Sequence, residues 1–360
     1  DISISALSAS NLKHAIAALM AGRRRRAILS VHGYASSEPQ PLSQIGFFTT
    51  PLITRLVAAT ICVSDGLRTY MVQKWGASNL KTCRIYNPVD GGKNPPPRTR
   101  SEFEGRAPLV LSAGRFVTYK QFPHLVRAFA NVNVPNARLI ILGEGPERAA
   151  IEGEIAALGL DDRVTLPGYV AEPWNYYAQA SCFALASSQE PFGLVVVEAL
   201  ANGLPVVATD CEGPREILDS GDYGVLTPIG DEKSLGRAIA MALAAPGDPA
   251  PSVARARDFA LDRGLDEYEA LIDRVADGGT ALERRLAVEA APLLDRRTNA
   301  DALRDEAPAR ASNPRRILLY AHSLTGGGAE RAIALLASGL VQRGHSVTIA
   351  IDYASSDNHA

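Results

Sequence analysis

The chain has few cysteines, no long apolar run and no excess of charge of one sign. Its four cysteines, Cys62, Cys83, Cys182 and Cys211, are far apart and form no CxxC pair of the kind that binds a metal or exchanges disulfides. Dispersed cysteines are typical of reduced thiols, so we expect a cytoplasmic protein. No segment approaches the roughly 20 apolar residues that a membrane span requires, because Glu198 interrupts the longest candidate.

Charge is balanced over the whole chain and concentrated at one place. The 37 basic and 39 acidic residues leave a net charge of −2, so no overall field attracts nucleic acid and we expect no nucleic-acid partner. The local exception is Arg23, Arg24, Arg25 and Arg26, which follow a helical pattern at residues 12–20. They form either a solvated helix end, which the helix dipole favours, or a basic contact with anionic lipid at the inner membrane face.

The length of 360 residues predicts two or three domains, and the alternation of strands and helices gives their order. From residue 107 to residue 245, short apolar strands alternate with helices. This is typical of a parallel, doubly wound α/β sheet that binds ligands at the carboxyl ends of its strands. Residues 1–90 hold further strands, ending at 33, 64 and 90. The other expected segments are a stiff linker at 91–106, a helical segment at 246–275, a charged tether at 276–315 and a strand–helix–strand unit at 316–360.

The stretch EPFGLVVVE, from Glu190 to Glu198, joins a predicted strand to a predicted helix. If the helix opens near Gly193, the free amides of Gly193 and Leu194 favour an anion such as phosphate. Glu198 then lies roughly 7 Å along the helix axis at about 1.5 Å per residue. Two carboxylates beside an anion fit hydroxyl groups better than bare phosphate, which indicates a nucleotide-diphosphate sugar. The alternative is a loop glutamate and a helix glutamate that pair with arginines.

Three other strand ends supply candidate ligand contacts in the same region. Arg115 and Lys120 follow the first strand of the regular alternation, where two cations could offset the charge of a diphosphate leaving group. Gly145 and Val170 follow the next two strands, where small residues and exposed backbone could accommodate a flat base. Isolated cations at such positions are otherwise solvated surface residues.

Two features outside this region also end strands. His32 closes a buried strand in VHG and is either a satisfied strand-end histidine or a donor or acceptor at the sheet's carboxyl edge. Gly326, Gly327 and Gly328 lie between a strand and a helix, where backbone amides can approach a phosphate closely. The spacing is not GxGxxG, so a tight structural turn explains these glycines equally well.

The motifs AGRFVTYKQF, LGEGP, LPGYV, SSQEPFGLVVVEALANGLPVVAT and EGPREIL, in that order, resemble the C-terminal domain of retaining glycosyltransferases of family 4 over residues 107–245. VHG, CVSDGLRTYM and RIYNPVD resemble the later part of that family's N-terminal domain. LTGGGAER and LVQRGHSVTIA resemble its beginning. The resemblance implies a GT-B fold, in which two Rossmann-like domains face a cleft, with no obligatory metal and no cofactor beyond the donor substrate.

The resemblance also implies residue roles, and no residue is an assured nucleophile. It places Glu190 near the donor sugar, Glu198 on the ribose, and Arg115 and Lys120 on the diphosphate. It places His32 near the reacting centre. The remaining implied substrate contacts are Phe192, Gly193, Leu194, Gly145 and Val170 on the donor, and Gly326, Gly327 and Gly328 near the donor phosphates and the acceptor.

The order of the motifs departs from the family, because the N-terminal motif stands last. The chain begins with Asp1 rather than Met and shows no signal peptide. We therefore expect either a piece of two fused transferases or a circular permutant, with the strands between Asp352 and Asp1 absent or truncated. Burying the apolar faces of residues 316–352 would be favourable, so we predict that this unit docks on the sheet of residues 1–90.

These observations favour a transferase that moves a sugar from a UDP-sugar, or less favourably a GDP-sugar, to a glycan, glycolipid or lipid-linked acceptor. Two alternatives stay open. One is a module that binds nucleotide sugar without transfer because the acceptor domain is incomplete. The other is a nucleotide-sugar epimerase of the same fold.

Overall fold

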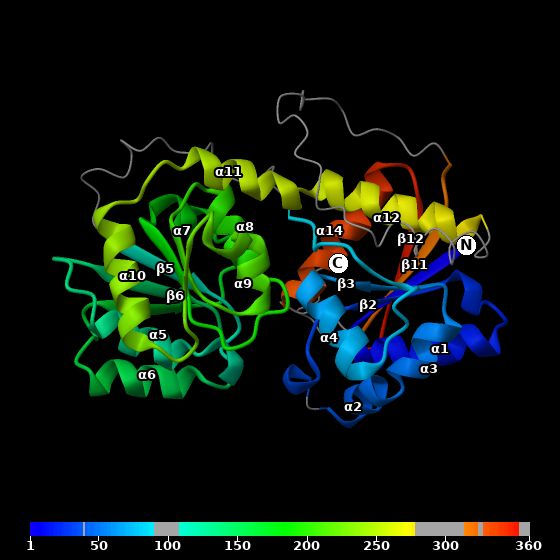
Figure 1. Ribbon diagram of the computed structural model, residues 1–360, viewed down its shortest axis with the longest axis horizontal. Coiled ribbons are helices and arrows are strands. Elements are labelled where there is room, and N and C mark those ends of the chain that lie inside the picture. Colours follow the sequence, from blue (N-terminus) through cyan, green and yellow to red (C-terminus); the bar gives the residue numbers. More distant parts are fainter. Residues whose placement is uncertain (39, 90–107, 278–312, 323–326, 353–360) are drawn as a thin grey trace. The chain divides into compact units, whose positions relative to one another are not determined.

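The computed structural model describes residues 1–38, 40–89, 108–277, 313–322 and 327–352. The chain divides into two units, each with its own parallel sheet (Figure 1). Unit 1 comprises Asp1–Pro88 and Leu261–Ala360, and unit 2 comprises Val89–Ala260. The expected linker at 91–106 and most of the expected tether at 276–315 lie outside the described residues. The expected helical segment at 246–275 is shared between the two units.

Unit 2 contains the regular strand–helix alternation. Its elements are β5 (Leu109–Ala113), η5 (Thr118–Lys120), α5 (Phe122–Ala130), β6 (Arg138–Leu142), α6 (Arg148–Ala157), β7 (Val164–Gly168), α7 (Trp174–Gln179), β8 (Cys182–Leu185), α8 (Leu194–Ala201), β9 (Val206–Thr209), α9 (Glu212–Ile217), β10 (Val225–Thr227), α10 (Glu232–Ala244) and α11 (Ala250–Ala256). The sheet order is β10-β9-β8-β5-β6-β7, with every pair parallel. Within unit 2, the first strand, β5, is in the middle of the sheet. The strands β6 and β7 follow on one side of it, and β8, β9 and β10 then follow on the other side, which is the Rossmann order.

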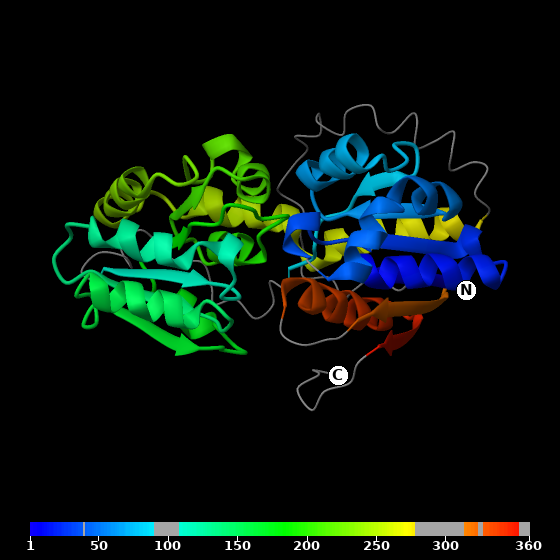
Figure 2. The same ribbon diagram turned by 90° about the horizontal axis from the view of Figure 1, so that it is seen from below.

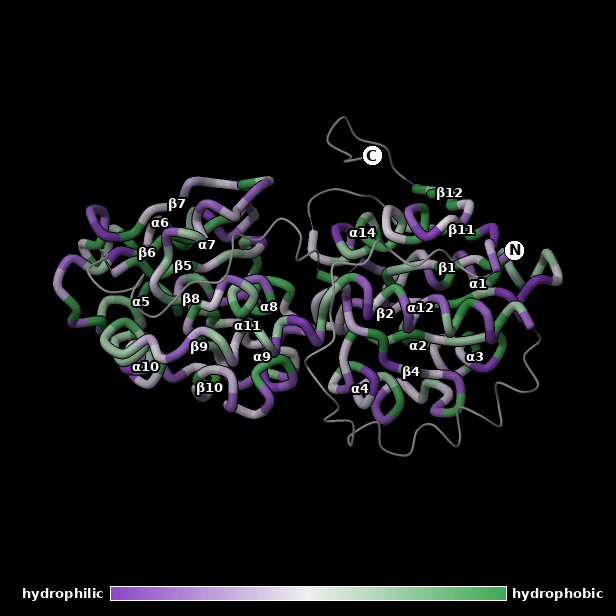
Figure 3. The backbone as a smooth tube through the Cα atoms, turned by 90° about the horizontal axis from the view of Figure 1, so that it is seen from above, coloured by the Kyte–Doolittle hydropathy of each residue, from purple (hydrophilic) through white to green (hydrophobic). Residues whose placement is uncertain are grey.

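The two faces of the unit 2 sheet are covered by helices. Leu125 and Phe129 of α5, Ile151 of α6 and Ile239 of α10 are buried in one cluster with side chains of β5, β6 and β8. The helices α7 and α8 lie on the other side of the sheet (Figure 1). The strands carry apolar side chains on both faces of the sheet because helices cover both faces. The helices are amphipathic, and their colour alternates between hydrophobic and hydrophilic residues along the tube (Figure 3).

Unit 1 is assembled from the two ends of the described chain. Its elements are β1 (Ile2–Ala6), α1 (Ser8–Met20), η1 (Arg24–Arg26), β2 (Ala27–Val31), α2 (Pro41–Phe48), α3 (Thr50–Leu56), β3 (Ala59–Cys62), α4 (Asp65–Trp75), β4 (Thr82–Arg84), α12 (Leu261–Ala276), β11 (Arg316–Ala321), α14 (Gly328–Gln342) and β12 (Ser346–Ile351). The parallel sheet has the order β12-β11-β1-β2-β3-β4. The predicted docking of residues 316–352 is therefore confirmed, with β11 beside β1 in a register that pairs Ile4 with Leu319.

The strand β1 is an element that the sequence analysis missed. Its sequence ISISA carries two serines, yet both serines are bonded rather than solvated. The Ser5 hydroxyl donates to Asn11 Oδ1 at 2.7 Å, and the two ring nitrogens of His14 lie 2.8 and 2.7 Å from the hydroxyls of Ser5 and Ser3. Polar partners supplied by α1 thus make a serine-rich strand acceptable in the middle of the sheet.

A buried arginine fixes the end of α14 to α12. Arg343 is 4 % exposed and donates to Asp266 at 2.6 Å, to Glu269 at 2.9 Å and to Asp262 at 3.2 Å. Burial opposes the charged form, but these carboxylates raise the pKa of the Arg343 guanidinium overall. The cluster links the C-terminal segment to the helix that begins this part of unit 1.

We expect Arg343→Gln to lower the unfolding free energy of unit 1 by about 2 kcal/mol, since it leaves three carboxylates without their cation. Trp75 is in unit 1 and Trp174 in unit 2, so urea unfolding followed by Trp75 fluorescence in a Trp174→Phe background reports unit 1 alone. The matched control is Arg316→Gln, because Arg316 makes a two-armed but 76 % exposed pair with Asp1. Its loss should cost under about 1 kcal/mol. Equal losses in the two variants would contradict the assignment.

Candidate functional site

The unit 2 sheet has a switch point between its neighbouring strands β5 and β8. From β5 the chain proceeds outward through β6 and β7, and from β8 it proceeds the other way through β9 and β10. The loops after β5 and β8 therefore diverge at the carboxyl edge of the sheet, which is where open α/β sheets bind ligands. These loops carry Lys120 and Glu190, two of the predicted site residues.

The structure brings Lys120 and Glu190 into direct contact, which the sequence analysis did not foresee. The Lys120 ammonium donates to Glu190 Oε2, and the two side chains are only 12 % and 9 % exposed. Burial alone would lower the pKa of Lys120, but the adjacent Glu190 carboxylate raises it, so the lysine stays charged. Burial raises the pKa of the Cys211 thiol to about 12, so this thiol is neutral at pH 7. The charges of Glu190 and Lys120 both act on it.

Backbone contacts hold the two loops in place. The amide of Ser188 donates to the carbonyl of Tyr119 at 2.8 Å, so the β8 loop is fastened to the β5 loop beside Lys120. On the other side, the Gly213 amide donates to the Glu190 carbonyl at 2.9 Å. A Cβ on Gly213 would lie 2.0 Å from the carbonyl oxygen of Phe192, so only glycine allows the chain to pass this close. The ion pair is thus held between two anchored loops.

The helix α8 begins as predicted. Leu194 is its first residue, and Gly193 precedes it with φ 109°, a conformation that glycine adopts without strain. Phe192 is buried, with its ring 5.7 Å from that of Phe259 in an edge-to-face contact. The first amides of α8 therefore have a fixed direction at the carboxyl edge of the sheet, close in sequence to Glu190.

Glu198 lies in α8 but is 2 % exposed. Its Oε2 accepts a 2.8 Å hydrogen bond from the hydroxyl of Tyr177, which is fully buried in α7. Its predicted contact with a ribose stays a prediction. Tyr177 is a residue that the sequence analysis missed, since an aromatic residue in a short helix gives no sign of a glutamate partner 21 positions away.

The other residues predicted in unit 2 occupy neighbouring strand ends. Arg115 follows β5 and is exposed. Val170 follows β7 and is partly buried. Gly145 follows β6, and a Cβ there would lie 2.4 Å from the Phe116 carbonyl oxygen, so close packing of two loops requires this glycine whether or not a base binds nearby.

In unit 1, His32 directly follows β2 at the carboxyl edge of that sheet. Its Nε2 lies 2.9 Å from the Ser30 hydroxyl, while its buried Nδ1 has no hydrogen-bond partner among the described residues. Burial lowers the pKa of His32 to about 4, so the imidazole is neutral at pH 7. A neutral imidazole can donate or accept a hydrogen bond but does not contribute charge to a site.

The glycine loop and the arginine run also belong to unit 1. Gly328 is the first residue of α14, and Gly327 precedes it after β11; Gly326 lies outside the described residues. All of Arg23–Arg26 are exposed, and η1 contains the last three. These residues and His32 are therefore in a different unit from Lys120 and Glu190.

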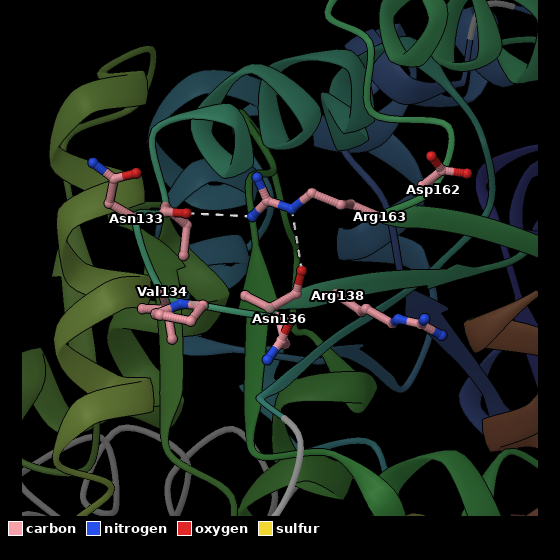
Figure 4. Close-up of a pocket in the computed structure, with 9 residues that line it drawn as sticks. Asn133, Val134, Asn136, Arg138, Asp162 and Arg163 are labelled. Atoms are coloured by element: carbon pink, nitrogen blue, oxygen red, sulfur yellow. Dashed lines mark hydrogen bonds between the residues drawn. The ribbon is translucent and has the colours of Figure 1, made fainter.

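A pocket of about 500 Å³ in unit 2 lies elsewhere (Figure 4). Its lining residues precede β6 and β7 or, in the case of Arg138, begin β6. The pocket is therefore at the amino edge of the sheet, opposite the loops of Lys120 and Glu190. Figure 4 shows the Arg163 guanidinium directed at backbone carbonyls, and it donates to those of Ala137 and Val132 at 3.2 and 3.3 Å. Its main role is therefore to support the chain. Among the described residues, no cluster of three His, Cys, Asp or Glu side chains could hold a metal ion, and no helix is long and apolar enough to cross a bilayer.

Two parallel, doubly wound α/β units are the architecture of the GT-B glycosyltransferases, and comparison with known proteins supports this class. Residues 97–259 match the family model described as glycosyl transferases group 1. The matched segment includes both Lys120 and Glu190.

Relatives and solved structures agree with the match. The chain is 37 % identical over 142 residues to the lipopolysaccharide core biosynthesis glycosyltransferase LpsE of Rhizobium meliloti, covering 39 % of this chain and 41 % of LpsE. It is 32 % identical over 166 residues to an N-acetylgalactosaminyltransferase of Campylobacter jejuni named for a diphospho-undecaprenol substrate, covering 46 % and 45 %. The chain thus spans under half the length of these curated relatives.

The fold similarity extends over both units. Anabaena HepE in complex with UDP superposes with a TM-score of 0.62 at 23 % identity, covering 80 % of this chain and 78 % of HepE. Sucrose-phosphate synthase from Thermosynechococcus elongatus superposes with a TM-score of 0.60 at 24 % identity, covering 80 % and 74 %.

Proposed function

We propose that this protein is a retaining glycosyltransferase that moves a sugar from a UDP-sugar to a glycan, glycolipid or lipid-linked acceptor. The observation that carries the proposal is the Lys120–Glu190 pair at the switch point of the unit 2 sheet. The names of LpsE and of the Campylobacter enzyme support a glycan or lipid-linked acceptor. The UDP in the HepE structure supports the choice of base.

In the proposed reaction, the bond between the anomeric carbon and the diphosphate oxygen breaks as a bond to an acceptor hydroxyl oxygen forms, and one proton is released. Negative charge grows on the diphosphate, where Lys120, Arg115 and the first amides of α8 stabilise it. Glu190 accepts hydrogen bonds from hydroxyls of the donor sugar. The Lys120–Glu190 ion pair compensates both charges, and in the proposed complex the diphosphate takes the place of Glu190 beside Lys120 while sugar hydroxyls take the place of Lys120 beside Glu190.

The remaining roles complete the proposal. Glu198 accepts a hydrogen bond from the ribose. The Glu198 carboxylate either accepts this bond beside the one from the Tyr177 hydroxyl or exchanges one for the other. His32, as a neutral imidazole, hydrogen-bonds near the reacting centre. Gly326, Gly327 and Gly328 contribute contacts to the donor phosphates and the acceptor. The arginines of residues 23–26 contact anionic lipid at the inner membrane face.

The first experiment is calorimetry with UDP and GDP, followed by incubation with UDP-sugars with and without acceptor. We expect UDP to bind more tightly than GDP and the donor to be consumed faster when a lipid-linked or oligosaccharide acceptor is present. Binding without turnover would identify a nucleotide-sugar-binding module. Interconversion of the sugar without acceptor would identify an epimerase. A module that only binds would follow from an incomplete acceptor domain, whereas unit 1 has a six-stranded parallel sheet, which favours transfer.

A further inference from the structure

Three side chains meet the carboxylate of Asp352 at the carboxyl edge of the unit 1 sheet. Asp352 directly follows β12, and it accepts hydrogen bonds from the Lys13 ammonium of α1 and the Tyr320 hydroxyl of β11, each at 2.5 Å. The Nδ1 atom of His322, which directly follows β11, lies 3.2 Å from the same carboxylate. We name these four residues the Asp352 cluster. None of them belongs to the Lys120–Glu190 site.

The cluster joins the two ends of the described chain. Figure 2 shows the orange and red strands β11 and β12 beside the blue N-terminal segment, and β11 pairs with β1 in the sheet. The Lys13–Asp352 bond connects residues 339 positions apart in the sequence. The four side chains therefore come together only because residues 316–352 dock on unit 1, and the sequence around His322 gives no sign of the cluster.

The hydrogen bonds of the cluster fix where the proton of the His322 ring lies. Burial opposes the charge on Asp352, but the bonds from its three partners lower its pKa to about 2, so it is a carboxylate at pH 7. A carboxylate can only accept, and the hydrogen between it and Nδ1 must therefore belong to the ring. In the neutral imidazole, Nε2 is then the unprotonated nitrogen, whose lone pair can accept a proton.

The ring of His322 is accessible while its partner is held in place. The His322 side chain is 48 % exposed, whereas that of Asp352 is 24 % exposed and bonded on both oxygens. Within the part of the chain that the structure describes, only Nδ1 of this ring makes a hydrogen bond. An accessible imidazole nitrogen whose opposite nitrogen is fixed by a carboxylate is an arrangement suited to general-base catalysis.

The proposed reaction releases one proton from the acceptor hydroxyl, and the other described histidines are poor places for it. Three of them are buried, with exposures of 5–7 %: His14, His124 and His345. Burial lowers the pKa of His32 to about 4, which makes its ring a weak base at pH 7. His322 thus differs from these four in being exposed and paired with a carboxylate.

His322 also lies on the same sheet edge as His32. The strand register aligns Tyr320 of β11 with Leu29 of β2 through Ser5 of β1. His322 and His32 follow these positions by two and three residues, so they stand within one residue of the same level. One strand, β1, separates β11 from β2, which puts the two strand ends about 10 Å apart. An acceptor made of several sugars could therefore meet both imidazoles.

We propose that His322 is the catalytic base for the acceptor hydroxyl and that Asp352 is its positioning residue; this inference rests on the proposed function. As the acceptor oxygen forms its bond to the anomeric carbon, its O–H bond breaks and the proton passes to Nε2 of His322. The electron pair of the bond between the anomeric carbon and the diphosphate oxygen leaves with UDP, and the imidazolium then returns the proton to water. This transfer is compatible with retention, because the face of attack depends on how the donor sugar is bound.

The first test measures sugar transfer by variants of the full chain, with the UDP-sugar and acceptor that the unaltered chain uses. His322→Gln should lower kcat about a hundredfold and leave UDP affinity unchanged. The rate of the unaltered chain should fall toward acid pH, because a protonated ring cannot take the proton, and His322→Gln should lack this fall. His322→Ala should regain part of its rate when imidazole is added, since the small base can enter the vacated space.

The second test needs no reaction. Nitrogen-15 NMR of the imidazole rings at pH 7 should show His322 protonated at Nδ1 and unprotonated at Nε2. Asp352→Asn should populate both tautomers, because an amide can donate as well as accept, and should lower kcat about tenfold or more. A merely structural role for Asp352 would leave the tautomer unchanged.

The matched control is His345→Gln, the same change at the amino edge of the same sheet, where His345 Nε2 lies 2.9 Å from Glu269. Its transfer rate should stay within about twofold of the starting rate, with the fall toward acid pH intact, because distant sites act independently. Trp75 fluorescence during urea unfolding, in the Trp174→Phe background, shows that unit 1 is folded in each variant.

Two results would overturn the role of His322 while sugar transfer itself stands. One is a His322→Gln variant that transfers near the starting rate, as expected if a diphosphate oxygen takes the proton instead. The other is a His322 ring protonated at Nε2 and not at Nδ1. If the unaltered chain transfers no sugar to any acceptor, the proposed function is refuted and this role with it.

Discussion

Glu190→Gln is expected to abolish sugar transfer, with a loss of about a thousandfold or more. The amide keeps the size of the side chain but replaces one acceptor oxygen with a donor and removes the charge that holds Lys120. Donor hydroxyls then lose an acceptor, and the lysine loses the partner that fixes its position. The measurement is initial-rate transfer from the UDP-sugar that calorimetry identifies, at saturating donor.

Lys120→Ala should abolish transfer for the complementary reason. The diphosphate loses a cation, and Glu190, 9 % exposed, is left as a buried charge without its partner. Breaking a pair of this kind should also lower the unfolding free energy of unit 2 by about 3 kcal/mol, followed by Trp174 fluorescence in a Trp75→Phe background. Lys120→Arg, which keeps the charge, separates the two effects: stability should largely return, while transfer stays low because the fork of a guanidinium differs from an ammonium.

The control for both variants is Glu154→Gln in α6. Glu154 pairs with Arg127 at 2.9 Å, but this pair belongs to the helical layer and not to a strand end. The change should leave transfer within about twofold of the starting rate and cost under about 1 kcal/mol. Turnover near the starting rate in Glu190→Gln or Lys120→Ala would refute the site assignment, provided that UDP still binds.

Much of the fold could be predicted because periodicity and chain order constrain it. The apolar runs of unit 2 are buried on both faces, so they stand out as strands in the sequence, and the helices between them fix the parallel direction. The docking of β11 and β12 was predictable from burial alone, since a strand–helix–strand unit cannot cover its own apolar faces. The start of α8 was predictable from Gly193, whose positive φ the structure shows.

The missed features depend on partners that are distant in sequence. Ile2–Ala6 could not be identified as a buried strand without knowing that Asn11 and His14 bond its serines. Lys120 and Glu190 are 70 residues apart, and each was assigned separately to a ligand. Their mutual contact follows only from the adjacency of β5 and β8, which helices and strands in sequence do not specify.

The importance of Gly213 was also hidden in the sequence. In EGPREIL it has the appearance of a helix-start glycine, and no positive φ demands it. The constraint comes instead from the EPFG loop 20 residues earlier. That loop presses the carbonyl oxygens of Phe192 and Glu190 to within 2.0 and 2.6 Å of the place where a Cβ would stand.

Gly213→Ala is therefore expected to damage the donor site without changing any charged residue. Backbone oxygen atoms cannot rotate aside as a flexible side chain can, so the EPFG loop must move by about 1 Å, and overpacking of this kind costs about 1–3 kcal/mol. The movement shifts Glu190 away from Lys120 and turns the first amides of α8. We expect UDP affinity to fall at least tenfold and transfer about a hundredfold, since a misplacement of about 1 Å has effects of that order.

The matched control is Gly153→Ala, in which the same methyl group is added in α6, where no atom of another part lies within 4 Å. That change should stabilise unit 2 by about 0.5–1 kcal/mol because alanine favours the helix. Calorimetry with UDP and Trp174 fluorescence during urea unfolding measure both variants side by side. If Gly213→Ala binds UDP as tightly as Gly153→Ala does, the loop contact is not what holds Glu190 in position. The Lys120 contact would then be sufficient by itself.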